Sequence, residues 1–467
     1  MRYISTRGSA PDLAFDDVLL TGLARDGGLY VPADWPRFSN TEWRDMRGLA
    51  YDELAVRVCA PFLGDAIAEE DFADMASDAY GAFDHDAVAP LKQLGPELWF
   101  MELFHGPTLS FKDYALQMVG RMFEHVLSRR GERICIVGAT SGDTGSAAIE
   151  ACRDRDAIDI FIMHPYQRCS DVQRRQMTTV GSMNVHNIAV DGTFDDCQDL
   201  VKALFNDIAF RDEMSLSAVN SINWARIMCQ IVYYAHAALS LGAPDRSVAF
   251  SVPTGNFGNV FAAYAARQMG LPISQLIVGS NENDILTRFL DSNDMTMRDV
   301  VPTHSPSMDI QVSSNFERLL FELVDRDGEV ASNLMQAFRA SGRLDLDQER
   351  WDDALRLFAG HRLSNEETLS AMKAVRESTG EIVDPHSAIG IVAGMTRRWD
   401  DAVPLVVAGT AHPAKFPDAV MAATGVHPDL PPHLADLMER EERYERLSPS
   451  LNVLQDHIRT GSNRVGG

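Results

Sequence analysis

The sequence has little cysteine, and its cysteines form no motif for metal or redox chemistry. Zinc sites and thioredoxin-like redox sites share C-x-x-C pairs, and this chain of 467 residues contains none. Six cysteines in so long a chain also argue against a disulfide scaffold. Several lie in apolar runs, so we expect ordinary buried thiols. The six are Cys59, Cys135, Cys152, Cys169, Cys197 and Cys229.

Basic residues are scarce relative to acidic ones. The chain has 42 Lys and Arg against 67 Asp and Glu, which gives a formal net charge of −25. A surface of this sign repels the phosphates of nucleic acids and of anionic membranes, so we expect neither as a partner. A small anionic substrate remains compatible, because one pocket can differ in sign from the whole surface.

Long apolar runs are absent too. No stretch approaches the length of a membrane span, and the N-terminal "MRYISTRGSAPDLAFDD" has no apolar core of a signal peptide. Apolar residues nevertheless make up 45% of the chain, so we expect an ordered globular protein in the cytoplasm. A chain of this length is expected to form two or three domains.

What the chain does contain is an alternation of strands and helices. Short apolar runs such as "RICIVGAT", "IDIFIMHP", "MNVHNIAVDG", "SVAFSVP" and "AVPLVVAG" are each followed by a loop or a helical stretch. Thr193 is expected to cap one of these helices. The alternation predicts an α/β fold of βαβ units with mostly parallel sheets, in which ligands bind at the carboxyl ends of the strands.

Four regions are expected from the same pattern. Residues 1–90 are mostly helical, residues 91–290 and 371–430 form the α/β lobes, residues 291–370 form a helical insertion, and residues 431–467 form a C-terminal tail. The insertion contains "SNFERLLFELVDRDGEVASNLMQAFRASGRLD", whose charged residues predict a solvated face.

Three segments carry groups suited to anions. "VGATSGDTGSAA" and "PTGNFGNV" each follow a strand and open a helix, where backbone N–H groups can bind an anion, although either could be a plain turn. In "NSINWARI", a helix that starts near Asn223 places Arg226 on its first turn. A cation is unfavourable there unless an anion lies nearby, and the alternative is a surface arginine.

Polar groups also follow the last strand. "AGTAHPAKF" supplies Thr410, His412 and Lys415, where a hydroxyl could face a ligand or cap a helix. "DPHSAIG" enters another helix, and its His386 is more typical of a structural histidine than of a catalytic one.

Lys112 lies between Phe111 and Asp113 in "HGPTLSFKD". It is either an exposed amine beside an acid or a partly desolvated nucleophile. A nucleophilic lysine can form a Schiff base with pyridoxal phosphate. That cofactor then needs a glycine-rich site for its phosphate, and the chain contains such a loop.

Taken together and in order, these motifs resemble threonine synthase of the bacterial and fungal type, a pyridoxal-phosphate enzyme of fold type II, the fold also found in the tryptophan synthase β subunit. The resemblance begins with "YISTRG" and "GLARDGGLYVP" and runs through "HGPTLSFKD", "GATSGDTGSAA", "NSINWARI", "PTGNFGN", "DPHSAIG" and "AGTAHPAKF". It implies two α/β lobes around pyridoxal 5′-phosphate.

The resemblance also implies a role for each matched residue. Lys112 would carry the cofactor, Asp143 would face the 3-hydroxyl of its ring, and Thr410 would contact the pyridine nitrogen. The cofactor phosphate would lie against Gly255, Asn256, Phe257, Gly258 and Asn259. The substrate phosphate would be bound by Ser141, Thr144, Asn220, Ser221 and Arg226.

The implied reaction converts O-phospho-L-homoserine and water to L-threonine and phosphate, the last step of threonine biosynthesis. Two alternatives remain open. A threonine synthase-like phospho-lyase would release 2-oxobutyrate and ammonia instead, and a non-catalytic protein would only bind a phosphorylated ligand. The sequence also leaves the oligomeric state open.

Overall fold

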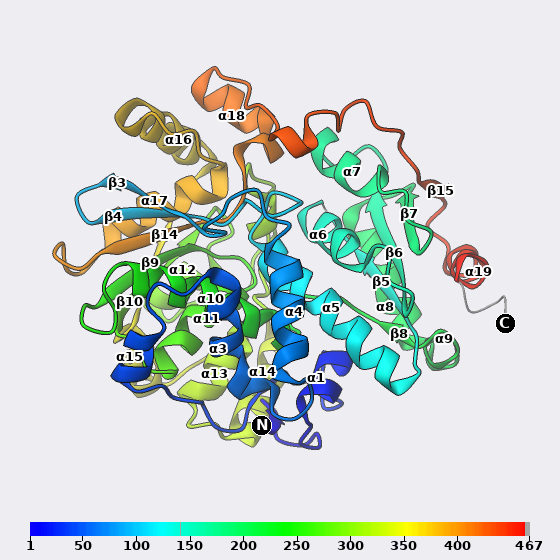
Figure 1. The fold of residues 1–467 in the computed structure, drawn as a ribbon, viewed down its shortest axis with the longest axis horizontal. Coiled ribbons are helices and arrows are strands. Elements are labelled where there is room, and N and C mark those ends of the chain that lie inside the picture. The colour runs from blue at the N-terminus through cyan, green and yellow to red at the C-terminus, as the bar shows by residue number, and fades with distance from the viewer. Residues whose placement is uncertain (141, 463–467) are drawn as a thin grey trace. The chain divides into compact units, whose positions relative to one another are not determined.

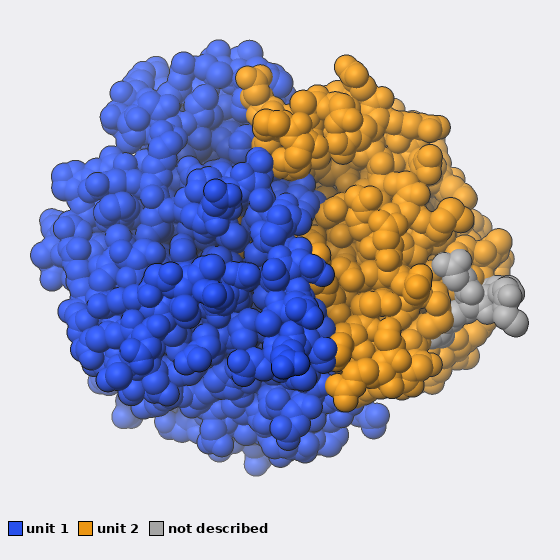
Figure 2. All heavy atoms as spheres, viewed as in Figure 1, with its two compact units in different colours: residues 1–111, 221–428 blue, residues 112–220, 429–467 orange. Residues whose placement is uncertain are grey.

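The structure, a computed structural model, describes residues 1–140 and 142–462. The chain divides into two compact units, which Figure 2 shows in two colours. Unit 1 consists of residues 1–111 and 221–428, and unit 2 of residues 112–220 and 429–467. Among the described residues, no helix is both long and apolar enough to cross a membrane.

Unit 1 is built on a six-stranded sheet with the order β13-β10-β9-β14-β4-β3 (Figure 1). Every neighbouring pair in it is parallel except the β3–β4 hairpin. Strands β9 and β14 are buried along their whole length, as continuous apolar strands of parallel sheets are. Helix α17 packs across β9, β10, β13 and β14.

The strands of unit 1 are β1 (Tyr3–Ser5), β2 (Tyr30–Pro32), β3 (Leu91–Gly95), β4 (Leu98–Glu102), β9 (Val248–Pro253), β10 (Ile273–Ser280), β11 (Met295–Thr296), β12 (Arg343–Leu344), β13 (Phe358–Arg362) and β14 (Leu405–Gly409). Its helices are α1 (Phe15–Thr21), α2 (Asn40–Asp45), α3 (Tyr51–Leu63), α4 (Glu69–Tyr80), α10 (Trp224–Ser240), α11 (Gly258–Gln268), α12 (Ile285–Ser292), α13 (Phe316–Leu323), α14 (Gly328–Ser341), α15 (Gln348–Leu355), α16 (Asn365–Thr379), α17 (Pro385–Arg397) and α18 (Pro417–Thr424).

Unit 2 is built on a five-stranded sheet with the order β15-β7-β6-β5-β8, in which all neighbours are parallel. Its strands are β5 (Ile134–Ala139), β6 (Ile158–Pro165), β7 (Val185–Val190), β8 (Leu216–Ser217) and β15 (Glu445–Leu447). Its helices are α5 (Lys112–Arg130), α6 (Asp143–Cys152), α7 (Asp171–Thr178), α8 (Phe194–Asn206), α9 (Ile208–Met214) and α19 (Leu451–Gly461).

The predicted α/β fold with mostly parallel sheets is confirmed. Thr193 caps α8 as expected, since its hydroxyl accepts a hydrogen bond from the Asp196 N–H and the Asp196 carboxylate accepts one from the Thr193 N–H. The segment 291–370 contains α13, α14 and α15, and it also contains β13, which pairs with β10 at the edge of the unit 1 sheet.

The prediction that the charges of "SNFERLL" form a solvated face is wrong for Glu317 and Arg318, which are only 3% and 0% exposed. The Glu317 carboxylate accepts hydrogen bonds from Nε and Nη2 of Arg7 at 2.9 and 2.8 Å, and from the Thr6 hydroxyl at 2.7 Å. Arg318 donates to the carbonyl oxygens of Tyr30 and Ile222. Because each charge is fully hydrogen-bonded, burial is tolerated, although it lowers the pKa of Arg318 to about 9.

We predict that Glu317→Ala lowers the free energy of unfolding by about 3–5 kcal/mol, because it leaves the Arg7 guanidinium buried without its carboxylate. Urea unfolding followed by circular dichroism measures this change. As a control, Asp245→Ala removes an exposed partner of Arg44 and should leave stability close to wild type. Equal stability of both variants would show that the Arg7–Glu317 pair does not contribute to the free energy of unfolding.

Candidate active site

In unit 2, a buried amine and a buried carboxylate lie side by side. Lys112 is the first residue of α5 and Asp143 is the first residue of α6, and Nζ of the lysine lies 3.4 Å from Oδ2 of the aspartate. Both side chains are buried, so the alternative of an exposed Lys112 is wrong. A desolvated lysine amine beside an acid is a candidate nucleophile and proton carrier.

The carboxylate of Asp143 is fixed by a glutamine that sequence analysis did not single out. Nε2 of Gln173 donates to Oδ1 of Asp143 at 2.9 Å, and Oε1 of Gln173 accepts from the Ser170 hydroxyl at 3.0 Å. A Cβ atom at Gly142 would lie 2.5 Å from the Gln173 side chain, so only glycine leaves room for this contact. Asp143 therefore presents a fixed acceptor toward Lys112.

Thr144 and Ser141 are also predicted to bind the substrate phosphate from this loop. Thr144 is the second residue of α6 and is partly buried. Ser141 lies outside the described residues. The loop itself is shaped by Thr140, whose hydroxyl accepts from the N–H groups of Gly142 and Gly145, both at 2.9 Å.

In unit 1, the loop 255–259 forms the N-terminus of α11. Phe257, the N-cap residue, has a positive φ of 63°, and the helix begins at Gly258. The first N–H groups of a helix have no partner inside the helix and can bind an anion. A Cβ at Gly255 would lie 2.8 Å from the carbonyl oxygen of Ser307, so the loop can follow this path only with glycine there.

The carbonyl oxygens of this loop are held by side chains from the start of α13. The Ser313 hydroxyl donates to the Gly255 carbonyl at 2.7 Å, and Nδ2 of Asn315 donates to the Asn256 carbonyl at 3.0 Å. The same Nδ2 donates to the Ser221 carbonyl at 3.1 Å. Asn315 thus brings the predicted segments around residues 221 and 256 together within unit 1. Asn220, the residue before, belongs to unit 2.

Arg226 is buried and incompletely paired. It lies on the first turn of α10, as predicted, and Asn223 caps that helix. The alternative of a surface arginine is wrong, because Arg226 is only 4% exposed. Its Nε and Nη1 have no hydrogen-bond partner among the described residues. Burial lowers its pKa to about 10, so the guanidinium still carries its charge at neutral pH, and no counter-ion for it is found within residues 1–140 and 142–462.

Thr410 follows β14 and is held through its backbone. Its N–H donates to the Ser387 hydroxyl at 3.2 Å, and Ser387 in turn donates to the Asp384 carboxylate. Its carbonyl accepts from the N–H of Phe111, the residue before Lys112, at 2.9 Å. Lys415, also buried, donates to the Thr108 carbonyl at 2.6 Å. The "DPHSAIG" and "AGTAHPAKF" segments therefore act together to fix the position of Thr410.

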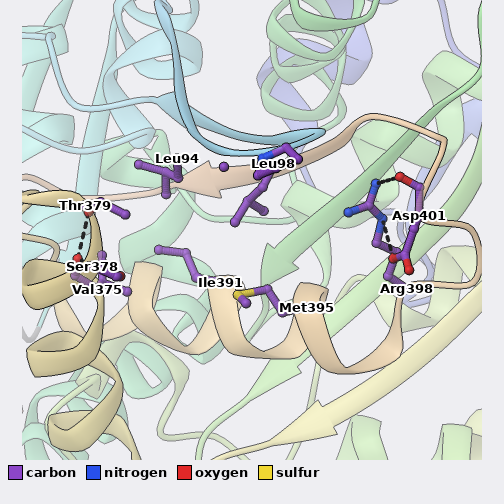
Figure 3. Close-up of a pocket in the computed structure, with 11 residues that line it drawn as sticks. Leu94, Leu98, Val375, Ser378, Thr379, Ile391, Met395, Arg398 and Asp401 are labelled. Carbon is purple, nitrogen blue, oxygen red and sulfur yellow. Dashed lines mark hydrogen bonds and ion pairs between the residues drawn. The ribbon is translucent and has the colours of Figure 1, made fainter.

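Elsewhere in unit 1, a cavity of about 380 Å³ contains none of the predicted site residues. Figure 3 shows Ile391 and Met395 of α17 pointing toward Leu94 and Leu98 of the β3–β4 hairpin. The guanidinium of Arg398 at its rim is occupied by backbone carbonyls. Its lining is Leu94, Gly95, Pro96, Leu98, Val375, Ser378, Thr379, Ile391, Met395, Arg398 and Asp401.

Each unit, taken by itself, contains groups that suit pyridoxal phosphate. Lys112 is a buried amine, and the α11 N-terminus is a site for a phosphate. The buried Nδ2 of Asn259 in that loop has no hydrogen-bond partner among the described residues. Fold and site together define a pyridoxal-phosphate-dependent enzyme of fold type II, and residues 85–353 match the family model described as "Pyridoxal-phosphate dependent enzyme".

The flanking segments narrow the class to one family. Residues 2–80 match the model "Threonine synthase N terminus", and residues 387–458 match "Threonine synthase, C-terminal". The chain is 58% identical over 465 residues to the threonine synthase of Pseudomonas aeruginosa, with 99% of each chain covered. The chain belongs to the threonine synthase family.

Solved structures support the same family assignment. The pyridoxal-phosphate-bound threonine synthase of Brucella melitensis superposes with a TM-score of 0.98 at 53% identity, covering 99% of this chain and 100% of that one. The yeast enzyme superposes with a TM-score of 0.94 at 38% identity, covering 98% of each chain. The cofactor expected from the sequence is therefore confirmed as pyridoxal phosphate, while the roles of individual residues stay predictions.

We predict that Gly255→Ala weakens the binding of pyridoxal phosphate, because the new Cβ would displace the loop from the Ser307 carbonyl. Overpacking of this kind costs about 1–3 kcal/mol, or roughly 5- to 150-fold in Kd. Titration of the apoprotein with cofactor measures the change. Gly95→Ala is the matched control, because its Cβ would meet only Leu98 Cβ at 3.9 Å. Unchanged affinity in Gly255→Ala would remove this loop from the cofactor site.

Proposed function

We propose that the protein converts O-phospho-L-homoserine and water to L-threonine and inorganic phosphate. The observation that carries this proposal is the buried guanidinium of Arg226, which lacks a counter-ion among the described residues. The α11 loop is suited to the cofactor phosphate, so Arg226 is available for a second phosphate, that of the substrate. Similarity to threonine synthases over nearly the whole chain supports the same reaction.

Lys112 is the base and acid of this reaction. Bound pyridoxal phosphate supplies an electron sink for the charge that remains when a proton leaves the carbon bearing the substrate amine. The Lys112 amine takes that α-proton. After loss of a β-proton and release of phosphate from Cγ, a proton is added at Cγ, water adds at Cβ, and a proton is returned to the α-carbon. One amine can both accept and donate protons, because each transfer restores its previous state.

Asp143 has to change partners before Lys112 can act. An ion pair with a carboxylate favours the charged ammonium form of the lysine, which is neither a base nor a nucleophile. The carboxylate is kept in place by Gln173, so the amine is the group that moves. With the amine gone, Asp143 is an acceptor suited to the 3-hydroxyl of the cofactor ring, which is the role expected from the sequence.

Arg226 binds the substrate phosphate and stabilises it as it leaves. The departing group gains negative charge while its bond to Cγ breaks. A guanidinium already desolvated by the protein interacts with that charge more strongly than one in water. The unpaired Nε and Nη1 atoms can each donate one hydrogen bond to phosphate oxygens.

A second candidate is the lyase reaction, in which the same elimination is followed by release of 2-oxobutyrate and ammonia. The chain is also similar to proteins named "Threonine synthase-like 2", one of which, from Xenopus laevis, is 33% identical over 452 residues. Both reactions use the same Lys112 chemistry and release the same phosphate. They differ in whether water adds at Cβ.

We predict that the purified protein, incubated with pyridoxal phosphate and O-phospho-L-homoserine, forms L-threonine in equal amount to the released phosphate. Amino-acid analysis and a phosphate assay on the same samples measure both. Formation of 2-oxobutyrate and ammonia with phosphate would replace the proposal by the lyase reaction. Absence of phosphate release would leave only ligand binding.

We predict that Lys112→Ala lowers turnover by at least about 10³-fold, because proton transfer by a positioned group contributes 10²–10⁴-fold, and that it abolishes the visible absorbance of the lysine-bound cofactor. Initial rates and a spectrum of the same sample test both effects. Lys202→Ala, which removes an exposed lysine, is the control and should change neither. Full turnover in Lys112→Ala would end the enzymatic assignment of this lysine.

A further inference from the structure

Two consecutive tyrosines of α10 reach the same atom of α11. The hydroxyls of Tyr233 and Tyr234 both hydrogen-bond to Oδ1 of Asn259, the latter at 2.7 Å. Both tyrosines are fully buried and Asn259 is 7% exposed. Helices α10 and α11 pack directly against each other within unit 1. The two hydroxyls therefore converge on one side-chain amide at the N-terminus of α11.

The convergence determines which way the amide of Asn259 faces. A tyrosine hydroxyl has one proton to donate, and a carbonyl oxygen has two lone pairs to receive it, so two tyrosines saturate Oδ1. Burial raises the pKa of Tyr234 well above its usual value, which keeps its proton available for donation. The amide NH₂ group is then directed away from the tyrosines.

That NH₂ group is left without an acceptor. Nδ2 of Asn259 is buried and has no hydrogen-bond partner among the described residues. An unsatisfied buried donor is costly, and it occurs here in the helix turn where the backbone N–H groups are also available to an anion. Together with those N–H groups, this unpaired donor makes the start of α11 a candidate site for an anion.

We propose that Tyr233 and Tyr234 are positioning residues that hold the Asn259 amide with Nδ2 toward the phosphate of pyridoxal phosphate. The proposal rests on the assignment of the α11 loop to that phosphate. Neither tyrosine contacts the cofactor; each acts through Asn259. Two donors are needed because one would leave a lone pair of Oδ1 free and allow the amide to rotate or flip. With both in place, the donor is already oriented before the phosphate arrives.

A purely structural role of the two tyrosines predicts a different result. Comparing a ligand that has a phosphate with one that lacks it distinguishes the two roles. If the tyrosines only stabilise the packing of α10 against α11, their removal weakens the binding of pyridoxal phosphate and of pyridoxal to the same extent. If they orient a phosphate ligand, the loss is confined to pyridoxal phosphate. Pyridoxal reacts with Lys112 through the same aldehyde but has no phosphate.

The experiment titrates the full-length apoprotein separately with pyridoxal phosphate and pyridoxal, following the absorbance of the lysine-bound form. Hydrogen bonds to charged groups are each associated with roughly 10- to 100-fold in affinity. We expect Tyr233→Phe and Tyr234→Phe each to raise the Kd of pyridoxal phosphate about 10-fold, with a larger rise in the double variant, while the Kd of pyridoxal stays unchanged. Tyr3→Phe, which removes the buried hydroxyl bonded to the Phe62 carbonyl, is the matched control and should change neither.

Asn259→Ala provides the second test, because it removes the amide itself. We expect it to reduce the preference for pyridoxal phosphate over pyridoxal, and we expect the two Tyr→Phe substitutions to have no further effect in that background. The proposal would be overturned by any of three results. These are a loss of affinity from the Tyr→Phe substitutions that adds to that of Asn259→Ala, an equal loss of affinity for pyridoxal phosphate and pyridoxal, or no loss of affinity in the single Tyr→Phe variants. Failure of the proposed reaction is recognised separately, since it changes the product formed and leaves the phosphate preference intact.

Discussion

The site in unit 1 depends on one requirement, that the carbonyl oxygens of its loops be hydrogen-bonded away from the ligand. A backbone carbonyl left unpaired in the interior is costly, and one turned toward a phosphate would repel it. Asn315 and Arg318 meet this requirement on three separate segments, by donating to the carbonyls of Tyr30, of the neighbours Ser221 and Ile222, and of Asn256. Because the carbonyls are occupied there, the N–H groups of the α11 N-terminus are free to face an anion.

Other polar side chains of the predicted site are also oriented by a hydrogen bond to a second residue. Gln173 is held by Ser170 so that its NH₂ meets Asp143, and Ser387 is held by Asp384 so that its oxygen receives the Thr410 N–H. In each case a second polar residue decides the orientation of the first. Such pairs make the site rigid without any contact to the ligand, because each donor is directed before the ligand binds.

Much of this could be predicted from the sequence because it is local. Strand β14 is a continuous apolar run, the Thr193 cap has its partner three residues away, and the loops after β5 and β9 contain the small residues that such turns need. Asn315 and its partners could not be found in this way, since Asn315 lies 94 residues from Ser221 and 59 from Asn256. Helical spacing in "SNFERLL" indicates an amphipathic helix but gives no information on whether its charges meet water or buried partners.

Arg226 is an unfavourable residue for the fold on its own, because it is buried and its Nε and Nη1 have no hydrogen-bond partner among the described residues. Burial of a guanidinium without a counter-ion among the described residues is unfavourable, and the same desolvation lowers the pKa of Arg226. The positive charge is also placed on the first turn of α10, where the helix dipole opposes it. In the proposed role of Arg226, binding of a phosphate would relieve both penalties, which a neutral analogue of the same shape could not do.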